Sequence, residues 1–355
     1  MKKLLICMFV VCVLQAAAQT PYISRVWEYC PAPGQFVNEL PEYEAGDDAN
    51  MMRLKAEEAI ADNNGGMISL GGWGGYVVFG FDHTVPNIAG EYDFVIMGNA
   101  FYSDAGSEKD GRRGGSCEPG IVMVSYDANG NGKPDDDWYE LAGSEHNNPQ
   151  TVHGYSLTYR RPAEDHKPTP SLVNKNLIDT TYISWEDNKG GKGCMYQLVY
   201  HTQPYFPQWQ EADELTFSGT RLPDNYADES GNGTYYVLYA YPWGYADNHP
   251  NNSEQAKLKI DWAVRSDGTP AELQGINFVK VYTGVHQQCG WIGETSTEIT
   301  GAKDLHLTTA APAVFADGQR CVYAVTGLYI GSEIPTEKGI YIVREGVETK
   351  KVTRL

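Results

Sequence analysis

Short runs of alternating apolar and polar residues, separated by turn residues, constrain the fold of this chain most strongly. Each run is four to nine residues long, is rich in Val, Ile, Tyr and Phe, and is bounded by Gly, Asp, Asn or Pro. The runs cover residues 75–81, 93–97, 121–126, 156–159, 196–201, 235–241, 256–264 and 276–283. Such spacing is typical of antiparallel strands, and strands do not alternate with helical segments as a parallel sheet requires. We therefore predict an all-β fold, a β-sandwich of the jelly-roll type.

One segment near the N-terminus has helical periodicity instead. Residues 48–61 place Met51, Met52, Leu54 and Ile60 among charged residues, and two asparagines and two glycines end the segment at 63–66. An acidic residue at the start and glycine after the end are the expected boundaries of a helix. We predict a short helix here, before the strands.

The first residues follow the plan of a secretory signal peptide. Lys2 and Lys3 precede an apolar run over 4–14, and residues 16–18 are alanines suited to cleavage after Ala18. The run is too short to span a bilayer, which needs about 20 residues. We expect residues 1–18 to be removed and the mature protein to be secreted or held at the cell surface, on the exterior of the outer membrane, with no transmembrane span.

Composition divides the rest of the chain into a large and a small domain. We expect the sandwich to cover residues 19–307, a linker to cover 308–313, and a small β module to cover 314–355. Within the module, residues 320–326, 339–344 and 348–353 have the pattern of short strands. Acidic residues exceed basic ones by 46 to 27, a net charge of −19, which disfavours nucleic acid and anionic membranes as partners.

The segment 127–137 (DANGNGKPDDD) is the sharpest local motif. Oxygen-bearing side chains alternate with other residues, glycine permits a tight turn, and acids follow. Calcium needs six to eight hard oxygens converging on one ion. The predicted ligands are the side chains of Asp127, Asn129, Asn131, Asp135 and Asp137, with the carbonyl of Lys133. The twelfth position is Trp138 where an EF-hand has Glu, so the alternative is a hairpin of Asn, Asp and Gly that binds no ion.

Two aromatic segments are candidates for ligand contact. The first surrounds Trp73 with glycines and continues to Tyr76; the second, over 241–249, holds Trp243, Tyr245 and Asp247. Exposed aromatic rings stack on flat ligands, and nearby polar groups fix their orientation. The alternatives are a Trp73 that closes the sandwich core and a 241–249 segment that is a structural turn.

Familiar catalytic motifs are missing from the sequence. It contains no Gly-x-Ser-x-Gly, His-Glu-x-x-His or Walker A motif. Ser116 or Cys117 could serve as a nucleophile, but no base can be paired with either, so no catalytic residue is predicted. A carboxylate pair of the glycosidase kind stays open because acids are so numerous.

Several motifs resemble secreted cell-surface proteins of Bacteroidetes, often labelled as PKD-containing and galactose-binding-like. The matching segments are 81–82, 85–87, 93–96, 98–101, 118–124, 127–145, 243–248 and 278–284. The resemblance covers about residues 65–305 and implies a jelly roll. Members are often encoded beside outer-membrane uptake systems, including those for cobalamin, which implies capture of a nutrient for such a transporter.

The tail resembles the C-terminal sorting domain of type IX secretion, a small β-sandwich read by the secretion machinery. The segments that carry the likeness are 322–327, 338–343 and 350–352. Two departures are apparent: 328–330 is apolar where a polar stretch is usual, and Glu348-Thr349 is expected to break the closing strand.

We expect a calcium-stabilised surface protein that captures a small molecule or glycan, such as cobalamin or a sugar. A secreted glycan-active enzyme and a purely structural surface protein are the alternatives.

Overall fold

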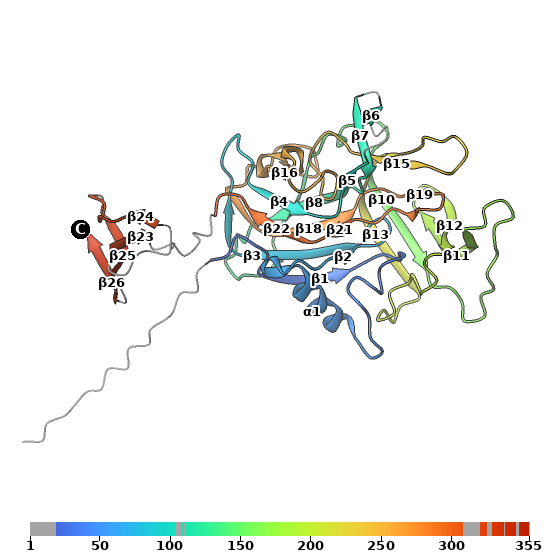
Figure 1. Ribbon diagram of the computed structural model, residues 1–355, viewed down its shortest axis with the longest axis horizontal. Coiled ribbons are helices and arrows are strands. Elements are labelled where there is room, and N and C mark those ends of the chain that lie inside the picture. The colour runs from blue at the N-terminus through green and yellow to red at the C-terminus, as the bar shows by residue number, and fades with distance from the viewer. Residues whose placement is uncertain are drawn as a thin grey trace, which may run out of the picture. The chain divides into compact units, whose positions relative to one another are not determined.

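The computed structural model describes residues 19–103, 108–109, 111–307, 320–324, 329–336, 338–345 and 348–354. The predicted signal peptide and the predicted linker lie outside the described residues. The chain divides into two compact units, one over Thr20–Leu307 and another that includes Thr308–Leu355. Antiparallel sheets make up both, so the predicted all-β sandwich is confirmed (Figure 1).

Two large sheets organise the first unit. The first has the order β1 (Arg25–Cys30), β3 (Tyr76–Pro86), β18 (Gly275–Thr283), β8 (Gly120–Ser125), β9 (Trp138–Leu141) and β17 (Ala263–Val264). The second has the order β12 (Lys192–Leu198), β11 (Leu177–Asp187), β10 (Val152–Arg160) and β13 (Glu214–Arg221).

Smaller sheets surround these two. One contains β14 (Tyr226–Asp228), β15 (Tyr236–Tyr239), β7 (Arg112–Ser116) and β5 (Phe101–Tyr102), with β6 (Glu108–Lys109) paired to β7. Another contains β16 (Lys257–Leu258), β4 (Phe94–Met97) and β22 (Gly301–Asp304). Two short pairs complete the unit: β19 (Gln288–Cys289) with β20 (Gly293–Glu294), and β2 (Ile68–Ser69) with β21 (Glu298–Ile299).

The main core lies on one face of the six-stranded sheet. Strand β18 is central, because it pairs with β3 on one side and with β8 on the other. Val279 and Val281 are fully buried, as are Val122 and Val124 on β8. Burying each such side chain stabilises the fold by about 1.5–3 kcal/mol. Lys280 points to the opposite face, where its ammonium lies 3.8 Å from the ring centroid of Tyr76.

The predicted helix is present as α1 (Ala49–Ile60). Asp48 caps it, since its carboxylate accepts a 2.8 Å hydrogen bond from the Met51 N–H. Met52, Ala56 and Ile60 recur every fourth residue and are buried in the main core. Short 3₁₀ turns occur at Ala61–Asn63, Glu254–Ala256 and Ile260–Trp262.

The prediction of one strand over 256–264 is wrong. The segment forms β16, then a 3₁₀ turn, then β17. Strand β16 pairs with β4, whereas β17 pairs with β9 in a different sheet. The chain therefore changes sheets within this segment, which a single straight strand cannot do.

The C-terminal unit is a sheet in the order β24 (Tyr329–Gly331), β23 (Arg320–Ala324), β25 (Gly339–Glu345) and β26 (Glu348–Arg354). Val322, Tyr341 and Val343 form its small core. The expected break at Glu348-Thr349 does not occur, because β26 pairs with β25 from Glu348 onward. Among the helices that the structure describes, none is long and apolar enough to cross a membrane.

Candidate functional site

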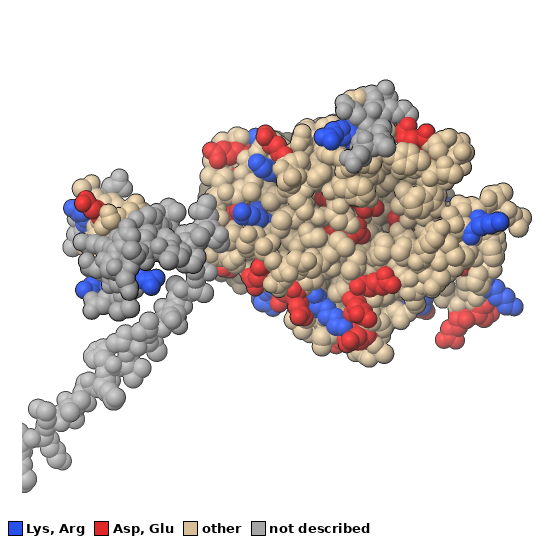
Figure 2. Space-filling model, in the orientation of Figure 1, with Lys and Arg blue, Asp and Glu red and all other residues tan. Residues whose placement is uncertain are grey.

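A pocket of about 350 Å³ opens in the first unit, with aromatic residues among its walls and carboxyl groups in its floor. Its aromatic and imidazole side chains are Phe36, Tyr200, His201 and Trp291. Its polar side chains include Gln35, Asn99, Ser116, Glu118, Ser296 and Glu298. Figure 2 shows acidic side chains in a hollow near the middle of the visible face, over the region where Figure 1 labels β21.

Asp247 fixes the polypeptide behind this pocket. One carboxylate oxygen accepts hydrogen bonds of 2.8 Å from the N–H groups of Asn99 and Ala100, and the other accepts one of 3.0 Å from Glu298 N–H. The residue has a left-handed backbone with φ 51°, which Asp tolerates better than most residues. Asp247 therefore joins the segment after β4, the segment after β15 and the start of β21.

Glu298 lies on β21 and is held by donors. The hydroxyl groups of Ser69 and Ser296 donate to Oε1, the former at 3.1 Å, and the Asn99 amide donates to Oε2 at 3.4 Å. These donors favour the ionised carboxylate. Sequence reasoning missed Glu298, although a charged residue within the strand-like stretch 293–300 is an unusual feature.

Three carboxyl groups meet at the pocket, where Glu118 and Glu298 line the floor and Asp247 lies behind them. Oxygen atoms of Glu118, Asp247 and Glu298 lie within 4.8 Å of one another. Burial, followed by the charges of Glu298 and Asp247, raises the pKa of Glu118, and a hydrogen bond to Glu298 raises it further. Burial also raises the pKa of both Asp247 and Glu298. The arrangement makes Glu118 the protonated donor and Glu298 the acceptor.

Charge compensation at this floor must come from protons or from a bound cation. No Lys or Arg of the described residues forms an ion pair with any of the three carboxyl groups. Buried carboxylates without a partner are strongly disfavoured, so they either take up a proton or bind a cation. Because the Glu118 proton is donated to Glu298, the carboxyl groups offer a ligand hydrogen-bond acceptors, and the nearby Ser116 hydroxyl can donate.

Cys117, next to Glu118, does not serve as a nucleophile. Its side chain is fully buried, and burial raises the pKa of its thiol to about 12. A thiol in that state carries almost no reactive thiolate near neutral pH. Ser116 does line the pocket.

The prediction that Trp73 is an exposed stacking platform is wrong. Its indole is fully buried and packs edge-to-face on Tyr155, with ring centroids 4.7 Å apart. Gly71 and Gly74 adopt positive φ, and this turns the segment inward. The ring fills the aromatic core beside the four-stranded sheet, the alternative that the sequence left open.

The other predicted ligand residues do not gather in one concavity. Tyr76 is half-buried under Lys280, and its hydroxyl donates to Glu28 at 2.9 Å. Tyr245 is buried, and its hydroxyl accepts a hydrogen bond from Glu145 N–H. Trp243 is 37% exposed and packs on Trp262. Of the five residues predicted to contact a ligand, only Asp247 belongs to the carboxyl cluster. The loop 241–249 is a packed turn, the alternative that the sequence left open.

The 127–137 loop follows β8 and forms a network of its own. Asp127 accepts hydrogen bonds from the N–H groups of Asn131 and Gly132 at 3.0 and 2.9 Å. The amides of Asn129 and Asn131 donate to Asp135 and lower the pKa of its carboxyl. The side chains of 127, 129, 131 and 135 therefore belong to one network, in which the two asparagines turn their amide nitrogens toward Asp135 and their oxygens toward backbone N–H groups.

The other two predicted calcium ligands, Lys133 and Asp137, differ in whether they take part in this hydrogen-bond network. The carbonyl of Lys133 accepts a hydrogen bond from Asp135 N–H. Asp136 joins the network by accepting a hydrogen bond from Ala128 N–H, whereas Asp137 takes no part in the hydrogen bonds found among the described residues.

Neither a protein-family model nor a curated protein matches this chain.

Proposed function

We propose that this protein binds a saccharide in the pocket over Glu118 and Glu298. The observation that carries the proposal is the pairing of aromatic walls with buried carboxyl groups that differ in protonation. A sugar ring presents C–H faces that stack on aromatic rings, and hydroxyl groups that both donate and accept hydrogen bonds. Trp291 and Tyr200 supply exposed rings, the carboxyl groups supply acceptors, and the Ser116 hydroxyl can donate.

The size of the pocket favours a sugar over a corrinoid. Its volume of about 350 Å³ lies near the lower end of the 300–1,000 Å³ typical of ligand pockets. One or two sugar rings fit such a space, whereas cobalamin is much larger. Of the two nutrients considered from the sequence, the glycan is therefore the better candidate.

Binding without hydrolysis is the better interpretation of the carboxyl pair. Glycosidases hold their two carboxyl groups about 5–5.5 Å apart or about 6.5–9.5 Å apart, with the scissile bond between them. Here the oxygens lie within 4.8 Å and Glu118 is hydrogen-bonded to Glu298. Two carboxyl groups this close favour sharing a proton over flanking a glycosidic bond.

A glycan panel with two tryptophan variants tests the proposal. Trp291 is 39% exposed at the pocket and Trp243 is 37% exposed elsewhere, so they form a matched pair. We expect Trp291→Ala to weaken saccharide binding about tenfold, or ~1.4 kcal/mol, and Trp243→Ala to leave it unchanged. Equal losses in both variants, absence of binding across the panel, or release of shortened sugars would contradict the proposal.

Calcium in the 127–137 loop is a second part of the proposal. The network already gathers four of the predicted oxygen-bearing side chains on one exposed loop, as a calcium site requires. The ion would hold the loop after β8 and brace the edge of the six-stranded sheet.

The location of the protein is also proposed. The signal-peptide pattern over 1–18 and the resemblance to surface proteins support export to the cell exterior, with the C-terminal module directed to the type IX machinery and the bound sugar passed to an outer-membrane transporter. Surface proteolysis of intact cells, with a mass measurement of the mature N-terminus, tests this. A chain that retains Met1 inside the cell would contradict it.

A further inference from the structure

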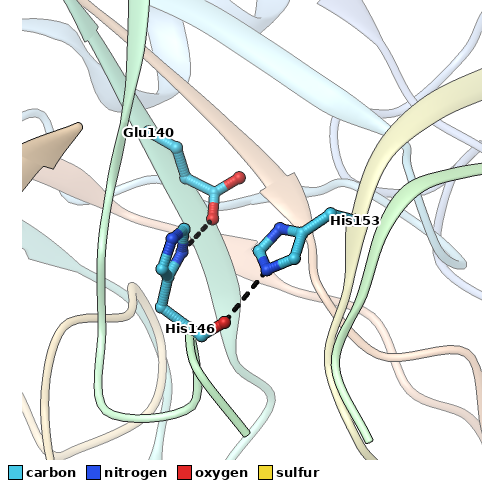
Figure 3. Close-up of side chains that lie close together, drawn as sticks. All are labelled: Glu140, His146 and His153. Atoms are coloured by element: carbon cyan, nitrogen blue, oxygen red, sulfur yellow. Dashed lines mark hydrogen bonds and ion pairs between the residues drawn. The ribbon is translucent and has the colours of Figure 1, made fainter. Parts of the chain in front are cut away.

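One carboxylate and two imidazoles meet where the two large sheets adjoin. Glu140 lies on β9 of the six-stranded sheet, His153 on β10 of the four-stranded sheet, and His146 on the loop between them. One ligand atom from each lies within 4.8 Å of the others. Figure 3 shows the carboxylate and both rings turned toward one another.

Neighbouring groups orient this cluster. Glu140 Oε1 lies 3.1 Å from Nδ1 of His146, and the hydroxyl of Thr220 donates to Glu140 Oε2 at 2.7 Å. The backbone N–H of His146 donates to the Gly143 carbonyl at 3.0 Å. Outer hydrogen bonds of this kind hold the ligands of protein metal sites in position.

Both ring nitrogens of His153 lie near oxygen atoms. Nδ1 lies 3.2 Å from the Thr220 hydroxyl oxygen, and Nε2 lies 3.0 Å from the His146 carbonyl oxygen. The hydroxyl of Thr220 donates to Glu140. A neutral imidazole carries a proton on one nitrogen only, so the other nitrogen keeps a lone pair that can bind a metal ion.

The cluster is accessible from a cavity. A space of about 550 Å³ is lined by Glu140, His146, His153 and Thr220, together with Arg265 and Asp267. His153 is exposed. A metal ion at the cluster would keep a coordination position open toward this cavity.

We propose that Glu140, His146 and His153 bind a divalent transition-metal ion of the zinc class. Two imidazoles and one carboxylate with an open fourth position is a ligand set that zinc adopts, and imidazole also suits copper and nickel. Calcium prefers oxygen ligands, so this site differs in chemistry from the 127–137 loop. The proposal stands independently of saccharide binding, since the two pockets share no residue.

The test is a titration of the full chain with Zn²⁺, in the presence of excess calcium to occupy the oxygen-rich loop. We expect one ion per chain, with protons released and weaker binding as the solution is acidified, because protons compete for imidazole. His146→Ala and His153→Ala should each lower the affinity at least about a hundredfold, and Thr220→Val about tenfold through lost orientation of Glu140.

His166→Ala is the matched control. His166 also pairs with a carboxylate, lying 2.5 Å from Asp179, but it is not part of a metal-ligating cluster among the described residues. Its variant should bind zinc as the wild type does. Far-UV circular dichroism confirms that each variant is folded, and Co²⁺ absorption gives a second readout of imidazole coordination. Absence of a stoichiometric site, or unchanged affinity in folded His146→Ala and His153→Ala, would overturn the proposal.

Discussion

Asp127 and Asp247 both accept hydrogen bonds from backbone N–H groups, but one lies in an exposed loop and the other is buried. Each carboxylate gathers backbone N–H groups from a loop: Asp127 accepts from Asn131 and Gly132, and Asp247 accepts from Asn99, Ala100 and Glu298. Asp127 lies on an exposed loop, whereas Asp247 is 3% exposed. Water can replace the hydrogen bonds that Asp127 accepts but not those that Asp247 accepts. Burial therefore decides how much each aspartate contributes to the stability of the fold.

Burial also reverses the protonation of the two regions. Hydrogen bonds from Asn129 and Asn131 lower the pKa of Asp135 in the exposed loop. Burial raises the pKa of Glu118 and Glu298 at the pocket floor. The exposed Asp135 is thus kept ionised, while the buried acids hold protons more strongly.

The largest expected effect is a difference in stability between variants of the two aspartates. Asp247→Ala leaves three N–H groups without an acceptor, two of them buried, and we expect it to lower the free energy of unfolding by about 3–5 kcal/mol. Asp247→Asn, which keeps one oxygen acceptor, should lose less. Asp127→Ala should lose less than about 1 kcal/mol in calcium-free buffer. Urea denaturation measures all three, and similar losses at both positions would break the comparison.

A second expectation concerns pH and the buried Glu294. Burial raises the pKa of this carboxyl to about 8 from 4.5. Its contribution to stability is therefore fully present below about pH 4.5 and is lost as the pH rises through about 8. Its Oε2 is buried and has no hydrogen-bond partner among the described residues, in agreement with a neutral acid.

Glu294→Gln isolates this effect from other titrating groups. The variant cannot ionise, so relative to the wild type it should gain up to a few kcal/mol between about pH 5 and pH 8, at ~1.4 kcal/mol per pKa unit. Denaturation of both proteins across this range gives the difference. A difference that stays constant with pH would show that Glu294 is already ionised in the folded state.

The smallest expected effect is that of calcium on the exposed loop. With free calcium about a hundredfold above its dissociation constant, the folded state should gain ~2.7 kcal/mol, and a chelator should remove that gain. Asp135→Asn should abolish the shift in melting temperature, because Asp135 receives both asparagine amides. Asp137→Asn, at a position outside that network, should change it less. If neither calcium nor chelator changes the melting temperature, the loop does not bind calcium and is an ordinary turn.

What the sequence predicted well depended on neighbours along the chain. Helix α1 was evident from its cap at Asp48. The 127–137 segment was evident as a loop with its own hydrogen bonds, whereas calcium binding there stays a prediction. The strands followed from alternation. All of these depend on contacts within about a dozen residues.

What could not be predicted depends on residues far apart. Glu118, Asp247 and Glu298 are brought together only by the pairing of sheets, and no local pattern announces the meeting. The prediction for Trp73 was wrong for a related reason. The neighbouring glycines favour a sharp turn, but they do not determine whether the indole points to solvent or packs on Tyr155. Similarly, Glu140 and His153 belong to different sheets, so their approach to His146 follows from tertiary packing.

The central position of β18 has a consequence for the time course of folding. Residues 275–283 are among the last of the first unit to be synthesised, yet β3 and β8 both depend on them for a neighbour. Until that segment emerges from the ribosome, the strands made earlier have open edges and exposed valines, which are prone to aggregate. Maturation of the whole sheet must therefore wait for the end of synthesis, and long-range pairing of this kind makes it slow.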